Sequence, residues 1–206
     1  MNKIKVLIAD DHTVVRTGLT ALFNSKPDIE VLGAAADGAE AVKMSERLKP
    51  DVVIMDLIMP VMDGVAATKL IREQTPEVKV LVLTTSTVSD DLHRVLAFGA
   101  SGIVTKSAPN ENLIDAIHAV AAGRQYIPSE IKKLIVQDPP AAELTERQLA
   151  ILEAMARGFT NAEIAKQLDI AEITVRKHLV VVFDKIGAGS RTEAVAIALR
   201  KQLVKM

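Results

Sequence analysis

The sequence predicts a doubly wound α/β domain followed by a smaller all-α domain, and three observations support this prediction. Up to about residue 122, short apolar runs alternate with patterns of helical period. These runs are almost continuously apolar, as in strands that are buried on both faces of a parallel sheet. From Leu144 onward only short helical patterns occur. The chain of 206 residues is long enough for two domains, each with its own core.

Five strand and helix pairs make up the α/β domain, which indicates a five-stranded parallel sheet with helices on both faces. Each expected strand is rich in β-branched residues, and each expected helix repeats its apolar residues at helical spacing. The expected strands are residues 5–9, 30–34, 51–55, 79–84 and 102–106. The expected helices are residues 14–23, 39–48, 65–73, 90–99 and 111–123.

A short linker is expected after the α/β domain. The segment GRQYIPSEIKKL is followed by QDPPAAE, where adjacent prolines and small residues end the helical pattern. We therefore assign residues 1–122 to the α/β domain, 123–142 to the linker and 143–206 to the all-α domain.

The all-α domain carries clear signals for the ends of about four helices. Gly158 and Gly187 stand where helices should stop. Three pairs of residues have the spacing of a capping box, which opens a helix: Thr145 with Gln148, Thr160 with Glu163, and Ser190 with Glu193.

The two central helices of this domain form a helix-turn-helix pattern. The helix opened by Thr160 is followed by a short Asp-Ile turn and by a second helix over about residues 171–186. In that second helix four apolar residues recur at spacings of four, three and four, which places them in the core: Val175, Leu179, Val182 and Ile186. Such a second helix would enter the DNA major groove.

Composition and charge exclude some kinds of protein. The chain has no cysteine, which removes disulfides, thiolate catalysis and Cys-ligated metal centres. Residues 143–206 hold 10 Lys and Arg against 8 Asp and Glu, which leaves 15 against 18 in the rest of the chain. This asymmetry permits nucleic-acid binding but does not argue for it. Signal-peptide and membrane-spanning patterns are absent, so we expect a cytosolic protein without membrane contact.

Charged and polar side chains follow four of the five expected strands. In doubly wound sheets, ligands bind outside the carboxyl ends of the strands, where the strand order reverses. The residues at these ends are Asp10 with Asp11, Asp56, Thr84 and Lys106. Each has an ordinary interpretation on its own, such as a solvated turn or an exposed lysine. Together at one edge of the sheet, they predict a binding site.

The three carboxylates of this site predict a magnesium ion. They repel one another at neutral pH and therefore favour a bound cation. Carboxylate ligands completed by water and a phosphate are typical of Mg²⁺. One carboxylate could then attack phosphorus and form an acyl phosphate. Lys106 could pair with the transferred phosphoryl group, and Thr84 could hydrogen-bond it.

Five motifs of the α/β domain resemble the receiver domain of two-component response regulators: ADDH at 9–12, MDLIMPVMDG at 55–64, LTT at 83–85, GASG at 99–102 and TK ending at Lys106. This resemblance implies a flavodoxin-like receiver in which Asp56 accepts a phosphoryl group from a histidine kinase. It also implies Mg²⁺ bound by Asp11, Asp56 and the backbone carbonyl of Ile58, with Asp10 acting through water.

The resemblance to receivers has two departures. The family often has an aromatic switch residue three positions before the lysine, whereas this chain has Ile103. Ser107 stands where many relatives carry proline or aspartate after the lysine. The resemblance still implies that Thr84 and Lys106 sense the phosphate, but aromatic rotation at position 103 is not available to this chain.

The second resemblance covers essentially all of residues 143–206. The stretch LTERQLAILEAMARGFTNAEIAKQLDIAEITVRKHLVVVFDKIGAGSRTEAV resembles the LuxR-type helix-turn-helix domain of NarL/FixJ-class regulators. It implies promoter DNA as a partner and a homodimer when phosphorylated, with the last helix, around residues 192–203, in dimer contact. The residues expected to contact DNA are Thr174, Arg176, Lys177, Val180 and Lys185.

Two residues of the second central helix depart from the LuxR-type pattern. Ala171 stands where relatives usually have a capping serine, and Val181 where they commonly have asparagine. Val180 and Val181 also lie off the core stripe, so we expect them to be exposed. They could contact thymine methyl groups, or they could form a protein interface with altered DNA affinity.

The leading hypothesis is a phosphorylation-switched transcription regulator that is no enzyme apart from self-dephosphorylation of Asp56. The alternative is a phosphorylation-switched signalling protein whose C-terminal helices bind protein rather than promoter DNA. A third hypothesis, a Mg²⁺-dependent phosphohydrolase, has little support, since the sequence lacks a DxD nucleophile pattern. A Gly-rich P-loop is also absent, so nucleotide hydrolysis has no support.

Overall fold

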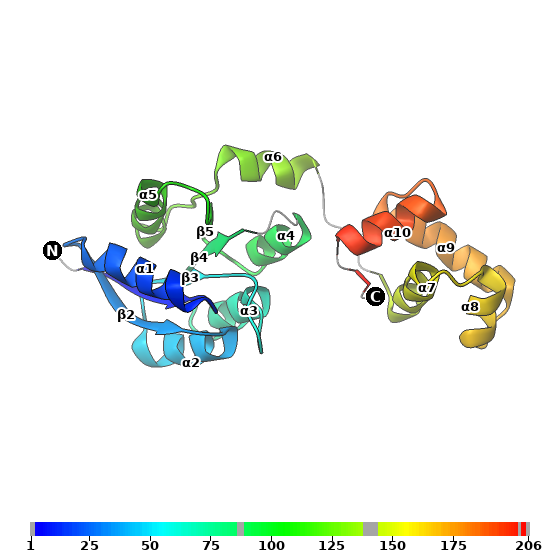
Figure 1. Ribbon diagram of the computed structural model, residues 1–206, viewed down its shortest axis with the longest axis horizontal. Helices are drawn as coiled ribbons and strands as arrows, with labels where there is room; N and C mark the ends of the chain where they lie inside the picture. The colour runs from blue at the N-terminus through cyan, green and yellow to red at the C-terminus, as the bar shows by residue number, and fades with distance from the viewer. Residues whose placement is uncertain (1–2, 86–88, 138–143, 202, 205–206) are drawn as a thin grey trace. The chain divides into compact units, whose positions relative to one another are not determined.

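The computed structural model describes residues 3–85, 89–137, 144–201 and 203–204. The chain forms two compact units, residues 1–138 and 139–206 (Figure 1). We call them the sheet unit and the helical unit. Within the described residues, no helix combines the length and apolar character that crossing a bilayer requires.

The sheet unit contains the five predicted strands and the five predicted helices, with ends shifted by a few residues. The strands are β1 Ile4–Ala9, β2 Ile29–Ala35, β3 Val52–Met55, β4 Lys79–Thr84 and β5 Gly102–Thr105. The helices are α1 Thr13–Asn24, α2 Gly38–Leu48, α3 Gly64–Gln74, α4 Ser89–Ala97 and α5 Asn110–Ala121.

All five strands are parallel and lie in the order β2-β1-β3-β4-β5. This is the strand order of a flavodoxin-like sheet, in which the direction of winding reverses between β1 and β3. The predicted fold class is therefore confirmed. In such a sheet the reversal point opens a crevice at the carboxyl ends of the strands, and the strand ends that the sequence singled out lie around it.

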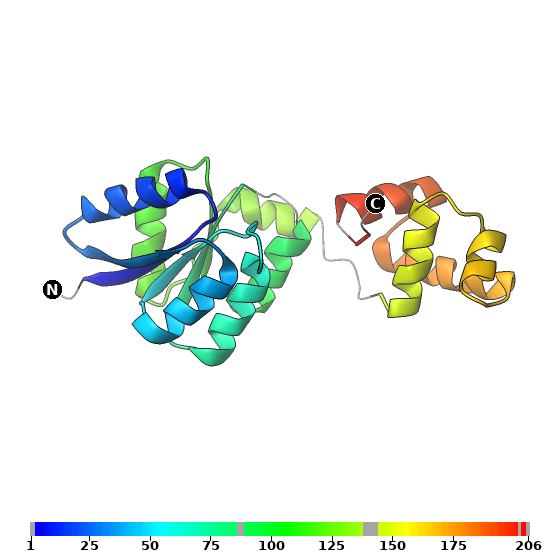
Figure 2. The ribbon, with the colours of Figure 1, turned by 60° about the horizontal axis from the view of Figure 1, so that its bottom comes forward.

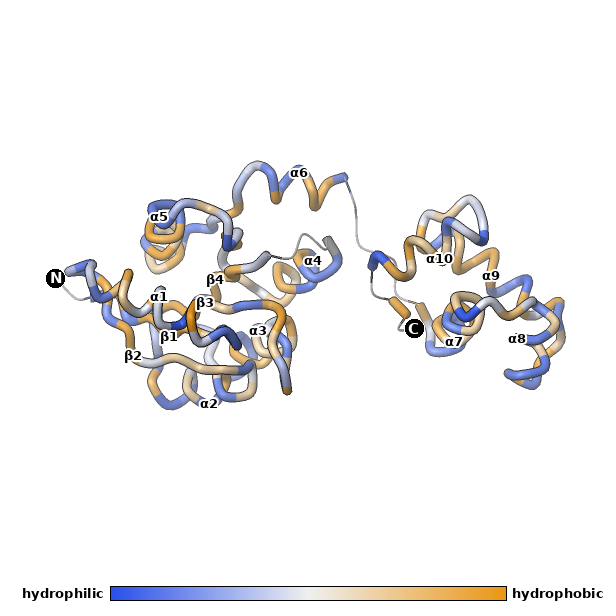
Figure 3. The backbone as a smooth tube through the Cα atoms, in the orientation of Figure 1, coloured by the Kyte–Doolittle hydropathy of each residue, from blue (hydrophilic) through white to orange (hydrophobic). Residues whose placement is uncertain are grey.

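Helices cover both faces of the sheet because the strands are apolar on both faces. On one face of the sheet, Phe23 of α1 and Ile117 of α5 belong to the same buried cluster as Ile8 of β1 and Ile54 of β3. Helices α2 and α3 pack against the other face in a second buried cluster. Figure 2 shows α1 and α5 on one side of the sheet and α2, α3 and α4 on the other. In Figure 3, β3 and β4 run through hydrophobic residues.

The segment expected to be a linker contains a helix, α6 Ser129–Gln137. Ile131 of α6 is 4% exposed and packs in a cluster with Val95 of α4 and Ile103 of β5. The Ile103 amide also donates to the carbonyl of Tyr126 at 2.8 Å, which continues pairing beyond the β5 edge. So short a helix is marginal alone, and burial of its apolar face stabilises it. Residues 138–142 of the expected linker lie outside the described residues.

Among its described residues, the helical unit has four helices, as predicted: α7 Glu146–Ala156, α8 Asn161–Gln167, α9 Glu172–Ile186 and α10 Arg191–Arg200. Helices α8 and α9 form the helix-turn-helix. The four predicted core residues of α9 are all buried in the main cluster of this unit: Val175, Leu179, Val182 and Ile186. Gly187 ends α9 with a φ of 73°, the left-handed conformation that glycine adopts without strain.

The predicted capping boxes are complete at two of the three helix starts. Thr145 with Gln148 opens α7, and Thr160 with Glu163 opens α8. At α10 the prediction is only half right. The Ser190 hydroxyl accepts from the Glu193 amide at 3.2 Å, but the Glu193 carboxylate accepts from Gly189 instead of Ser190. The Glu193 side chain therefore reaches one residue further back than a capping box requires.

Candidate functional site

The sheet register brings Asp10 and Asp56 together. Strands β1 and β3 are neighbours, and Ala9 pairs with Met55 at their carboxyl ends. The next residue of each strand is an aspartate, and the Asp56 amide donates to the Ala9 carbonyl at 2.8 Å. Asp10 is 1% exposed and Asp56 is 4% exposed. Two carboxylates are thus held in the interior at the reversal point of the sheet.

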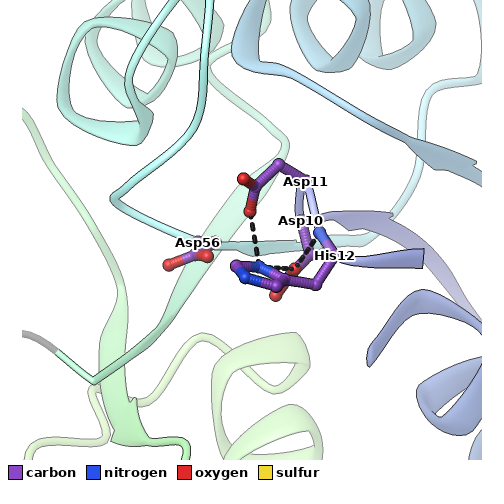
Figure 4. Close-up of side chains that lie close together, drawn as sticks. All are labelled: Asp10, Asp11, His12 and Asp56. Atoms are coloured by element: carbon purple, nitrogen blue, oxygen red, sulfur yellow. Dashed lines mark hydrogen bonds and ion pairs between the residues drawn. The ribbon is translucent and has the colours of Figure 1, made fainter. Parts of the chain in front are cut away.

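Asp11 and His12 complete the acidic cluster at this edge. Figure 4 shows Asp11 and His12 in the loop after β1, facing Asp56. One ligand atom each from Asp10, Asp11, His12 and Asp56 lies within 4.8 Å of the others. His12 Nδ1 is 2.7 Å from Asp11 Oδ1 and 3.3 Å from Asp10 Oδ1. His12 belongs to the ADDH motif, but no role was predicted for it from the sequence.

Lys106 provides the positive charge of the site. Its ammonium lies 2.7 Å from Asp10 Oδ2 and donates to Asp56 Oδ2 at 2.6 Å. Burial alone would lower the pKa of Lys106, but its contacts with Asp10 and Asp56 outweigh burial and raise that pKa above its ordinary value. Lys106 is therefore a cation at neutral pH, and it compensates the two buried carboxylates.

The donor set fits a hard divalent cation. Three carboxylates face one lysine, so the cluster keeps an excess of negative charge. Asp11 Oδ1 is buried and accepts no hydrogen bond from the described residues, although His12 Nδ1 lies 2.7 Å from it. Closely spaced carboxylate oxygens with a free lone pair are what Mg²⁺ requires. The acidic cluster that we predicted is therefore present and compatible with Mg²⁺.

Thr84 ends β4 beside the cluster, and Ile58 lies in the loop after β3. Thr84 closes β4, is fully buried, and its carbonyl accepts from the Lys106 amide at 2.9 Å. This bond fixes where Lys106 leaves β5. Ile58 lies two residues after Asp56, with an exposed side chain, and its amide makes a long 3.4 Å hydrogen bond to Asp56 Oδ1.

The loop after Asp56 depends on a glycine. A Cβ atom at Gly64 would lie 1.9 Å from the carbonyl oxygen of Asp56, which excludes any side chain unless the backbone shifts. The Gly64 amide donates to the Leu57 carbonyl at 2.9 Å, and Asp63 caps α3 by accepting from the Ala66 amide. The predicted turn at Asp63 and Gly64 is present. The close approach to Asp56 was not predicted, since a sequence does not show which backbone atoms meet.

The five residues expected to contact DNA all lie on α9, but their surroundings differ. Arg176, Lys177 and Val180 are exposed, whereas Thr174 is half-buried. Arg176 donates to Glu172 at 2.6 Å, an exposed pair of little energetic weight. Lys185 is half-buried, and its ammonium donates to the Gln148 side chain of α7 at 3.1 Å. Lys185 thus also ties α9 to α7.

Two departures from the LuxR-type pattern have structural counterparts. Ala171 is the N-cap residue of α9 and makes no side-chain cap hydrogen bond. Val180 is 70% exposed and Val181 is 44% exposed. The expectation that these two valines lie off the core stripe is therefore confirmed.

Comparisons with known proteins identify both units. Residues 6–118 match the response regulator receiver domain, and residues 142–198 match the bacterial regulatory proteins of the luxR family. The sheet unit is thus a receiver and the helical unit a LuxR-family domain. The chain belongs to the NarL/FixJ class of two-component response regulators, which are transcription regulators and not typical enzymes.

Relatives of the whole chain share this organisation. The transcriptional regulatory protein LiaR of Bacillus subtilis (strain 168) is 37% identical over 209 residues, which cover 98% of this chain and 99% of LiaR. The oxygen regulatory protein NreC of Staphylococcus aureus (strain JH9) is 38% identical over 216 residues, with 98% and 100% covered. RcsB of Salmonella enterica serovar Typhimurium, solved bound to promoter P1flhDC with the phosphomimetic BeF3⁻, is 26% identical, with a TM-score of 0.72, and the match covers 97% of this chain and 99% of RcsB.

Proposed function

We propose that phosphorylation of Asp56 by a partner histidine kinase switches this response regulator and controls its binding to promoter DNA through α9. The observation that carries the proposal is the position of Asp56. It is a nearly buried carboxylate beside Asp10, Asp11 and Lys106, at the carboxyl edge of the sheet. Lys106 alone leaves the three carboxylates with an excess of negative charge, and a bound divalent cation would offset that excess and the charge of a phosphoryl group on Asp56.

In the proposed reaction, a carboxylate oxygen of Asp56 attacks the phosphorus of a phosphohistidine. The new bond joins phosphorus to oxygen, the phosphorus–nitrogen bond breaks, and the departing histidine nitrogen takes up a proton. The product is an acyl phosphate, which self-dephosphorylation with water would remove. Asp11, Asp56 and the backbone carbonyl of Ile58 would hold Mg²⁺, with Asp10 acting through water, and the ion would neutralise the negative charge.

Lys106 and Thr84 are the residues that we propose to bind the phosphoryl group. Lys106 is charged at neutral pH, since its pKa is raised. Its ammonium, 2.6 Å from Asp56 Oδ2, needs only a small movement to contact phosphoryl oxygens. The Thr84 hydroxyl would donate a hydrogen bond to the same group. Both side chains would then change their contacts when Asp56 is phosphorylated.

In the helical unit, we propose that Thr174, Arg176, Lys177, Val180 and Lys185 form the DNA-binding surface of α9. Arg176 and Lys177 would bind phosphates or base edges, as exposed cations on such a helix do. A homodimer formed on phosphorylation, with α10 in contact, would present two such helices. Because promoter DNA is the proposed target, we also propose that the protein acts in the cytoplasm.

Incubation with a small phosphodonor and Mg²⁺, followed by intact mass measurement, tests the acceptor assignment. The wild-type chain should gain the mass of one phosphoryl group, and Asp56→Asn should gain none. Asp51→Asn is the matched control, because Asp51 precedes the same strand at its opposite end and is exposed. A phosphoryl group that is still added to Asp56→Asn contradicts the proposal.

A further inference from the structure

The exposed apolar side chains of the helical unit are concentrated on one helix. Among its described residues, the large hydrophobic side chains that are exposed are Ile173 at 59%, Val180 at 70% and Val181 at 44%. All three belong to α9. Single exposed apolar residues are ordinary on a protein surface, but three on the same helix suggest a binding surface.

These three residues share the face of α9 opposite its core. Val180 and Val181 follow Ile173 by seven and eight positions, which is about two helical turns. Lys177, which is exposed, stands four residues after Ile173 and four before Val181. The buried residues Val175 and Val182 belong to the other side of the helix. We call Ile173, Lys177, Val180 and Val181 the outer face of α9.

The composition of the outer face suits DNA better than protein. The cores of protein interfaces are enriched in aromatic residues and depleted in lysine, whereas the outer face has no aromatic residue and places Lys177 between the apolar ones. The DNA major groove admits a helix and offers acceptors for lysine. Its apolar feature is the 5-methyl group of thymine. Lys177 could therefore donate to the groove acceptors, and the branched aliphatic side chains around it could contact thymine methyl groups.

We propose that Ile173, Val180 and Val181 recognise thymine methyl groups in the operator of this regulator. The proposal rests on the DNA binding proposed above and adds the class of base that is read. From Ile173 to Val181 the helix rises by only about 12 Å, so in the major groove these side chains can reach only a few neighbouring base pairs, which are stacked at ~3.4 Å. The contacted thymines should therefore lie within one short stretch of each half-site.

Replacing thymine by deoxyuridine tests this proposal, because it removes the methyl group and keeps the base pairing. The full-length protein, treated with a small phosphodonor and Mg²⁺, first selects its site from a random duplex library. The selected site is then prepared with deoxyuridine at each thymine in turn. Each contacted methyl should give about fourfold weaker binding when lost, the equivalent of ~0.8 kcal/mol. Positions outside the half-sites should give no change.

Protein variants connect the effect to the outer face of α9. Val180→Ala and Val181→Ala should bind the thymine site more weakly and should largely lose the difference between thymine and deoxyuridine. Their salt dependence should equal that of wild type, whereas Lys177→Gln should lower the salt slope by about one. Val136→Ala is the matched control, since Val136 is an 80% exposed valine on α6 of the sheet unit.

The outcomes separate this inference from the proposed function. A selected site that binds equally well with thymine and deoxyuridine overturns the inference alone, as does a difference that persists in the Ile173→Ala, Val180→Ala, Val181→Ala triple variant. In either case the outer face is left as a protein-docking surface. Failure to select any DNA site from the library contradicts the proposed DNA binding itself. Near-wild-type unfolding temperatures of the variants exclude misfolding as the cause of weaker binding.

Discussion

The receiver buries charge at its proposed site, whereas the helical unit exposes apolar side chains at its own. Asp10 and Asp56 are 1% and 4% exposed, while Val180 is 70% exposed. Folded proteins ordinarily expose charged side chains and bury apolar ones, so both sites depart from the usual pattern. The receiver compensates its carboxylates inside the domain through Lys106. On α9, in contrast, the described residues of the unit leave these valines uncovered.

This difference indicates how each unit responds to its ligand. The receiver cluster is already assembled and held by strand ends, so a phosphoryl group would redistribute contacts that exist, above all those of Lys106. In our proposal, the outer face of α9 would make its contacts only when DNA binds, and its burial would then be part of binding. We therefore expect substitutions in the receiver site to change the stability of the free protein, and substitutions on the outer face to change binding alone.

Gly64→Ala should have the largest effect on stability. The new Cβ would meet the Asp56 carbonyl oxygen at 1.9 Å, so the loop must move. We expect the free energy of unfolding to fall by about 3–5 kcal/mol, with loss of phosphorylation at Asp56. Gly18→Ala on α1 is the control, since its Cβ meets nothing within 4 Å, and alanine there should stabilise the helix by about 0.5–1 kcal/mol. Chemical denaturation measures both, and equal effects would contradict the close approach.

Lys106→Met should destabilise the receiver in a way that Mg²⁺ reverses. Without the ammonium, Asp10 and Asp56 remain buried without their cation, and we expect a loss of about 1–3 kcal/mol in the presence of EDTA. Mg²⁺ should recover much of this loss, because a ligand that binds only the folded state stabilises it. Lys43→Met on the exposed side of α2 should change little in either buffer. A loss that is the same with and without Mg²⁺ would argue against the metal site.

Two valines of α9 compare the core with the outer face directly. Val182 is fully buried and Val180 is 70% exposed, two residues apart on the same helix. Val182→Ala should lower the free energy of unfolding by about 2 kcal/mol, and Val180→Ala should change it by less than about 0.5 kcal/mol. Thermal unfolding of the full-length variants measures the difference. A stability loss for Val180→Ala as large as that for Val182→Ala would show that the valine is covered in the folded protein.

Much of the fold and the site followed from the sequence, because the relevant signals are local. Apolar runs gave the strands, and parallel strands necessarily end at one edge, so Asp10, Asp56, Thr84 and Lys106 were expected together. In α9, the spacing of four, three and four likewise predicted that Val175 and Val182 are buried and that the valines between these positions are exposed.

The features that the sequence did not predict depend on contacts between distant segments or on the detailed conformation of one loop. Helix α6 falls within the predicted linker, because so short a helix becomes stable only when its apolar residues pack against α4 and β5. The contact of Lys185 with Gln148, 37 residues apart, has no local signal. His12 lies beside Asp11 because of how one loop turns. At α10, Glu193 reached Gly189 although its spacing matched a capping box.

The smallest effect that we expect is a difference in pH dependence between two capping boxes of the helical unit. The box at α7 uses Gln148, which does not titrate, whereas the box at α8 uses Glu163. The backbone amide of Thr160, and then its hydroxyl, donate to the Glu163 carboxylate and lower the pKa of Glu163 below its ordinary value. A lowered pKa in the folded state means that this contribution to stability is present above the ordinary pKa of 4.5 and is lost as pH falls through the folded value.

An NMR titration of the Thr160 and Thr145 amides follows the two boxes separately in the full-length protein. The Thr160 amide signal should shift with a midpoint below pH 4.5, the ordinary pKa of a glutamate, while the Thr145 signal, bonded to Gln148, should not follow that titration. Glu163→Gln should abolish the shift at Thr160 and keep the hydrogen bond, since glutamine also completes a capping box. A Thr160 shift that persists in Glu163→Gln would mean that another group titrates there, and the box at α8 would then be no different from the box at α7.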